Sequence, residues 1–111
     1  MAIESQGDGM PMGKLVRNRI PDIILTSGRT PTVRVLGLME YKTALHDKLI
    51  EEVSELGAAT TAEERLGEAA DILEVLAAIA DLDGFTIDDV AYAARQKADE
   101  RGSFTERLWL E

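Results

Sequence analysis

Apolar positions recur with a helical period along most of the chain, and the two longest such stretches adjoin each other. With about 100° of rotation per residue, most apolar residues between Met39 and Ala59 fall on one side of a helix. The next stretch opens with Thr61 and Glu64 in a T-x-x-E pattern, typical of a helix N-terminus, and ends before Gly84. The pattern predicts two long antiparallel helices joined by a short turn.

Shorter helical stretches flank this pair. In GKLVRNRIPDIILTSG, a short extended piece precedes a helix with Pro21 in its first turn and Gly28 at its C-terminal end. Near the C-terminus, Thr86 is followed three residues later by Asp89, and the helical pattern ends at Arg101 and Gly102. The predicted fold class is all-α: a compact bundle of two long helices, a third C-terminal helix and a short N-terminal helix.

Two segments show the alternation typical of strands instead. TPTVRVLG sets β-branched residues between polar ones and predicts a short strand over residues 32–36. The tail RLWLE alternates in the same way. A minor two-stranded pairing of these segments is therefore part of the expected fold.

Length and composition fit one folded domain. The chain has 111 residues and no cysteine, which excludes disulfides and thiolate metal sites and is typical of a cytoplasmic protein. No apolar run approaches the roughly 20 residues that span a bilayer, so we expect no membrane partner. Residues 1–12 contain Gly, Ser, Asp and Pro without an apolar core. They predict a disordered extension or tag remnant, ahead of a domain over residues 13–111.

The charge of the chain narrows the choice of partners. The net charge of −9 argues against nucleic-acid binding, which depends on an excess of Lys and Arg that meets phosphates. A small phosphorylated ligand remains compatible with this charge, because a divalent metal reverses the local sign.

Several acids are predicted to lie away from the solvent-facing side of the long helices. On the first helix, Glu52 projects only about 20° outside Leu45, and Glu55 about 60° further round. An unpaired buried carboxylate is unfavourable, so Glu52 is expected either to be paired or to bind something. The buried stripe expected beside it consists of Leu45, Leu49, Val53 and Leu56.

The second long helix separates its acids more clearly. Its solvent-facing stripe consists of Glu63, Glu74 and Asp81, whereas Glu68 and Asp71 project among apolar residues. Acids at positions i and i+3 share a helix face, so Glu68 and Asp71 are expected to converge with the pair on the first helix. Those apolar neighbours are Ile72, Val75 and Ile79, and another face carries Leu66, Ala70, Leu73 and Ala77.

Four converging carboxylates repel one another unless a cation lies between them. Ligands that are all oxygen suit Mg²⁺ or Mn²⁺ better than Zn²⁺, which favours His or Cys. The alternative is that these acids are solvated or salt-bridged, as most acids on helices are.

Three motifs of the chain resemble those of a known enzyme family. EEVSE, twelve residues and then EAAD resemble the E-E-x-x-E … E-x-x-D signature of the all-α nucleoside triphosphate pyrophosphohydrolases, the MazG-like superfamily. KLVRNRIPDII and KADERGSF resemble one branch of it, the small house-cleaning enzymes related to phosphoribosyl-ATP pyrophosphohydrolase. The resemblance covers nearly all of the chain from Met12 to Glu111.

The resemblance implies Mg²⁺-dependent hydrolysis of a nucleoside triphosphate, ordinary or non-standard, to the monophosphate and pyrophosphate. Glu52, Glu55, Glu68 and Asp71 match the metal ligands of the family. Glu51 matches the first Glu of the signature and is expected to ligate a further metal or to orient the attacking water. The residues expected to contact phosphate are Lys14, Arg17, Lys97 and Arg101.

Two positions near these motifs are left open. Asn18 stands where the branch usually has an acid, which leaves its role undefined. Lys48 lies one turn before Glu52 and either binds phosphate or pairs with Glu52.

Two other functions compete with this one. Phosphoribosyl-ATP pyrophosphohydrolase uses the same chemistry on another substrate, and a non-catalytic helical module would use the bundle for self-association or a basic partner. A bundle this small leaves much apolar surface, so at least a homodimer is expected. The preferences for base and sugar depend on loops that sequence patterns do not define.

Overall fold

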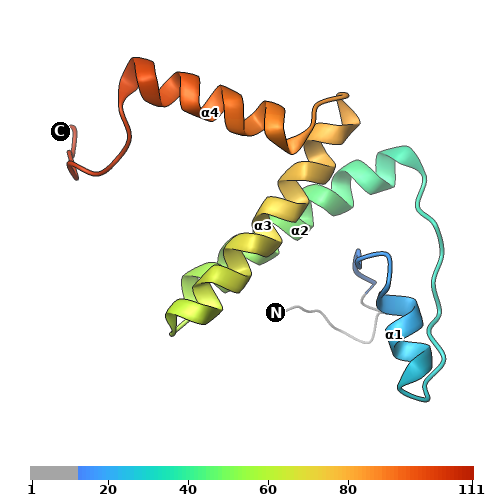
Figure 1. The fold of residues 1–111 in the computed structure, drawn as a ribbon. Helices are drawn as coiled ribbons and strands as arrows, with labels where there is room; N and C mark the ends of the chain where they lie inside the picture. The colour runs from blue at the N-terminus through green and yellow to red at the C-terminus, as the bar shows by residue number, and fades with distance from the viewer. Residues whose placement is uncertain (1–12) are drawn as a thin grey trace. The chain divides into compact units, whose positions relative to one another are not determined.

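The computed structural model describes residues 13–111, and within them the protein is all-α. These residues form four helices and no strand. The chain divides into two compact units, the first reaching Val75 and the second beginning at Leu76. The extension predicted over residues 1–12 lies outside the described residues. The helices are α1 (Ile20–Thr26), α2 (Leu38–Ala58), α3 (Ala62–Leu82) and α4 (Ile87–Arg101) (Figure 1).

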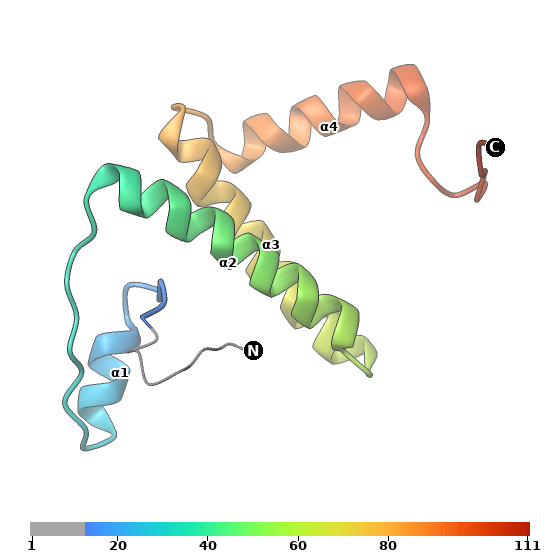
Figure 2. The ribbon, with the colours of Figure 1, turned by 180° about the vertical axis from the view of Figure 1, so that it is seen from behind.

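The long helices α2 and α3 lie side by side and antiparallel, as both ribbon views show (Figures 1 and 2). The start of α3 follows the predicted cap, because the Oγ1 of Thr61 accepts a hydrogen bond from the Glu64 N–H at 3.1 Å. The Glu64 carboxylate turns back to accept from the N–H of Thr60 at 2.8 Å. This lowers the pKa of Glu64 and fixes the turn between the helices.

Few side chains of the described residues are buried. The buried apolar ones are Leu45 on α2 and Val75 on α3, with 2% and 8% of their surface exposed. The buried stripe predicted on α2 is wrong for Val53, which is 53% exposed. Val53 lies about 80° from Leu45 around the helix, so it does not share the buried direction of Leu45.

The first helix and the segment after it are held by local interactions. Pro21 lies in the first turn of α1, and Gly28 ends it with a φ of +95°, as predicted. Arg34 pairs with Glu40 at 2.9 Å, and Glu40 also accepts from the N–H of Gly37 at the start of α2. The Arg34 partner and the Gly37 N–H lower the pKa of Glu40.

The predicted strand over residues 32–36 is wrong, and so is its pairing with the tail. The segment is extended, but Val33 and Val35 are 60% and 97% exposed. The tail RLWLE also forms no strand, and Leu108 and Trp109 are exposed in it. A two-stranded pairing is marginal by itself, so alternation without a sheet to join does not produce strands.

The second unit contains the end of α3, then α4 and the tail. Thr86 and Asp89 form the predicted capping box of α4, and Gly102 ends it with a φ of +83°. No residue of α4 is buried. Among the described helices, none is long and apolar enough to cross a membrane.

Candidate metal centre

Three carboxylates from the two long helices meet in the first unit. Glu52 and Glu55 lie nearly one turn apart on α2, and Glu68 projects from α3. One oxygen atom from each lies within 4.8 Å of the others, a spacing that suits a single cation. The convergence of these three acids was predicted from helix geometry, because a short turn between antiparallel helices brings the end of α2 beside the start of α3.

Glu52 is the acid that distinguishes this cluster from an ordinary solvated surface. It is only 5% exposed, and among the described residues its Oε1 is the buried side-chain atom without a hydrogen-bond partner. Its other oxygen, Oε2, lies 3.5 Å from the Nζ of Lys48. Burial raises the pKa of Glu52, and the nearby charge of Glu55 raises it further. A buried, unpaired carboxylate oxygen is unfavourable unless a cation or donor satisfies it.

The other two members of the cluster repel one another. Loss of hydration raises the pKa of Glu55, and the neighbouring charges of Glu68 and Glu51 add to the increase. The pKa of Glu68 is raised as well, again first by lost hydration. The cluster therefore carries an excess of negative charge, and a divalent cation bound there would neutralise it.

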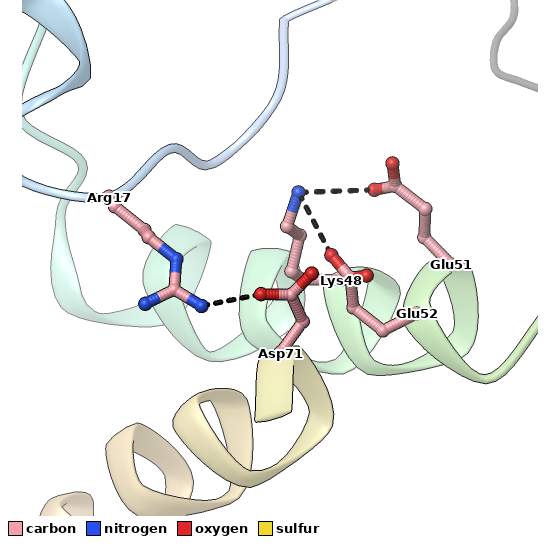
Figure 3. Close-up of polar contacts among 5 residues, drawn as sticks. All are labelled: Arg17, Lys48, Glu51, Glu52 and Asp71. Atoms are coloured by element: carbon pink, nitrogen blue, oxygen red, sulfur yellow. Dashed lines mark hydrogen bonds and ion pairs between the residues drawn. The ribbon is translucent and has the colours of Figure 1, made fainter. Parts of the chain in front are cut away.

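Asp71, the fourth predicted ligand, lies beside the cluster and differs from its members in being paired with an arginine. Its Oδ1 accepts a hydrogen bond at 2.6 Å from the guanidinium of Arg17, in the segment before α1 (Figure 3). Asp71 stays outside the group whose oxygens lie within 4.8 Å, but its charge contributes to the raised pKa of Glu52. The predicted set of four is thus seen as three converging carboxylates and one held by an arginine.

Lys48 stands between two acids of α2. Its Nζ lies 3.5 Å from an oxygen of Glu51 and 3.5 Å from one of Glu52, and the side chain is 21% exposed (Figure 3). Of the two roles left open by the sequence, the structure shows the pairing. The positions i, i+3 and i+4 were the signal for it.

The remaining predicted residues take part in none of the contacts described above. Lys14 is exposed at the start of the described chain. Lys97 and Arg101 are exposed on α4, which belongs to the second unit. The Arg17–Asp71 pair had no signal in the sequence, because these residues are 54 positions apart.

The donor set fits a hard divalent cation. Glu52, Glu55 and Glu68 would hold it, with Asp71 as a further ligand once its oxygen is available. Carboxylate oxygens without His or Cys favour Mg²⁺ or Mn²⁺. The buried, unpartnered Oε1 of Glu52 is the observation that sets this cluster apart from exposed acids.

Comparisons with known proteins leave the family open. No protein-family profile matches the chain, and no solved structure matches it. Over 50 residues the chain is 58% identical to an uncharacterized protein of Mycolicibacterium smegmatis (strain ATCC 700084 / mc(2)155). The match covers 45% of this chain and 51% of that protein, so the chain spans about half the length of the curated relative it matches.

Proposed function

We propose that this protein is a MazG-like nucleoside triphosphate pyrophosphohydrolase that depends on Mg²⁺ or Mn²⁺. The observation that carries the proposal is the buried Oε1 of Glu52, unpartnered within a triad of carboxylates from two antiparallel helices. The three motifs that resemble the family supply the substrate class and the reaction. In that reaction, water is added across the α–β phosphoanhydride, and the products are the nucleoside monophosphate and pyrophosphate.

The residues of the site divide the work between binding and orientation. Glu52, Glu55 and Glu68 would hold the cation, with Asp71 as a further ligand. The bound cation would neutralise these carboxylates and the substrate's phosphates, which is the main requirement of phosphoryl transfer. Lys48 pairs with the Oε2 of Glu52 and leaves Oε1 available to a cation. Glu51 orients the attacking water.

Basic residues complete the substrate site in this proposal. Lys14 and Arg17, from the segment before α1, and Lys97 and Arg101, from α4, contact the phosphates. Guanidinium groups suit this task because they offer paired donors to phosphate oxygens. This arrangement rests on the family resemblance for Lys97 and Arg101.

The proposed enzyme is at least a homodimer in the cytoplasm. Leu66 and Leu73 lie on one face of α3 and are 73% and 53% exposed, and Ile50 on α2 is 57% exposed. Apolar helix faces of this kind pack against other helices in bundles. The same observation favours the second candidate function, a non-catalytic module that associates with itself.

The test is pyrophosphate release from a panel of nucleoside triphosphates, with and without Mg²⁺. The panel includes ordinary, oxidised and deoxy nucleotides, and phosphoribosyl-ATP as the substrate of the related enzyme. We expect Mg²⁺-dependent release with equal amounts of monophosphate and pyrophosphate. Best activity on phosphoribosyl-ATP would transfer the protein to that enzyme class. No release from any substrate, and no thermal shift with Mg²⁺ or Mn²⁺, would favour the self-association module.

A further inference from the structure

Two basic side chains, Lys48 and Arg17, pair with acids of the site, and they are held there in different ways. Lys48 belongs to α2, one turn from Glu52, and its side chain is 21% exposed. Arg17 comes from the segment before α1, and its side chain is 57% exposed (Figure 3). Lys48 is therefore tied to the acids by its own helix, whereas Arg17 reaches α3 from another segment and can leave without disturbing a helix.

The contact of Arg17 is short but consists of a single nitrogen–oxygen pair. Its guanidinium donates to Oδ1 of Asp71 at 2.6 Å, the shortest ion pair among the described residues. Asp71 lies one turn after Glu68, on the face of α3 that meets α2. A divalent cation bound by Glu68 and Asp71 would come close to the guanidinium, and like charges at that range repel.

We infer that Arg17 is an exchangeable counter-ion of Asp71. When a divalent cation binds Asp71, Arg17 releases this carboxylate and then binds anionic phosphate. Arg17 and the cation therefore compete for Asp71, and each weakens the other's hold on it. The phosphate contact rests on the proposed function, whereas the competition rests only on the cation site.

This exchange gives the site an order of events. Before the cation is bound, Arg17 is occupied by Asp71 and is a poor partner for phosphate. After the cation takes Asp71, the guanidinium keeps its charge and its paired donors and lies at the edge of the site. Phosphate affinity then depends on cation loading through Arg17.

The first test is calorimetric titration of Mn²⁺ into the full chain without nucleotide. Arg17→Gln should bind Mn²⁺ about 5-fold more tightly than wild type, and Arg17→Lys, which keeps the charge, should lie between them. Arg19→Gln, an exposed arginine of the same segment, is the matched control and should leave the affinity unchanged. Equal or weaker Mn²⁺ binding by Arg17→Gln would overturn the exchange and make Arg17 a support for Asp71.

The second test follows the released segment and the phosphate. In wild type, Mn²⁺ should increase hydrogen exchange of the amides around Arg17, and the increase should be absent in Arg17→Gln. With Mn²⁺ present, Arg17→Gln should bind inorganic pyrophosphate about 10-fold more weakly. If no variant binds Mn²⁺, the cation site of the proposed function fails and the exchange fails with it. If Mn²⁺ binding shifts as expected but no nucleotide is hydrolysed, the exchange stands and the proposed reaction fails.

Discussion

The two faces of α3 differ in which apolar and acidic side chains they bury and which they expose. The face that meets α2 carries Val75, which is only 8% exposed, together with the acids Glu68 and Asp71. Another face carries Leu66 and Leu73, which remain more than half exposed. Acids near the buried side and leucines on the exposed side invert the usual amphipathic pattern. An inversion of this kind points to ligand chemistry on one face and to helix packing on the other.

The largest expected effect on activity comes from substitution of Glu52, the buried acid of α2 that faces α3. Glu52→Gln should lower Mg²⁺-dependent pyrophosphate release at least about 100-fold, because it removes a charged ligand from the centre of the cluster. It should also raise the melting temperature of the metal-free protein, because it removes an ionised group from a buried position.

The control for this variant is Glu74→Gln. Glu74 is exposed on the same helix as Glu68 and takes no part in the cluster. Its substitution should leave both activity and melting temperature unchanged. Loss of activity in Glu74→Gln as severe as in Glu52→Gln would mean that net charge, rather than the cluster, governs activity.

The second prediction separates the two faces by their energetics. Val75→Ala should lower the free energy of unfolding by about 2 kcal/mol, because it opens a cavity against α2. Leu73→Ala should change the free energy of the single chain little and should instead weaken self-association. Denaturant unfolding and light scattering, each over a range of protein concentrations, measure the two effects. A monomeric wild type would contradict the assignment of the Leu66 and Leu73 face to helix packing.

The third prediction concerns pH. The pKa of Glu52 is raised above the ordinary value of 4.5, mainly by burial, so the folded protein binds this proton more tightly than the unfolded chain does. The stability that comes from this proton is present below pH 4.5 and is lost as pH rises through the raised pKa. Glu40 and Glu64, whose pKa values are lowered, act in the opposite direction and lose their contribution as pH falls below 4.5.

The measurement is thermal melting between about pH 4 and pH 7, with and without Mg²⁺. Above pH 4.5, the metal-free protein should lose stability with rising pH, and the loss should be smaller in Glu52→Gln. Stabilisation by Mg²⁺ should grow with pH, because the cation binds the ionised carboxylates. Stabilisation by Mg²⁺ that is independent of pH would place the cation elsewhere.

The smallest effect is expected at Thr61, the N-terminal cap of α3. The cap supports the whole helix, and therefore both of its faces. Thr61→Ala should lower the free energy of unfolding by about 1 kcal/mol, because the Glu64 N–H loses its acceptor. Mn²⁺ affinity should stay the same, since the cap lies more than one turn before Glu68. Thr61→Ser restores the hydroxyl and should recover most of the stability.

Helix periodicity was enough to predict the helices and most of the cluster. Caps and turn residues such as Thr61, Gly28 and Gly102 act within a few positions of the chain, so the helix ends were predictable to about one residue. Glu52, Glu55 and Glu68 were predictable because two antiparallel helices leave little freedom in which faces meet. Their convergence required no knowledge of distant contacts.

The features that sequence could not supply depend on contacts between distant segments. Arg17 and Asp71 are brought together by the path of the chain before α1, which no periodicity encodes. Residues 32–36 have a strand pattern but no sheet to join, and strand formation requires a partner. The exposure of Val53 was missed because helix periodicity gives the direction of a side chain but not the width of the covered stripe.

The most direct test of the cation site is nuclear magnetic resonance of the full chain titrated with Mn²⁺ well below one equivalent. The paramagnetic ion broadens the amide signals nearest to it. The account predicts that the signals of Glu52, Glu55 and Glu68 broaden first, and that this selectivity disappears in Glu52→Gln. Broadening that begins at the solvent-facing acids Glu63, Glu74 and Asp81, or that spreads evenly over the acidic surface, would contradict it.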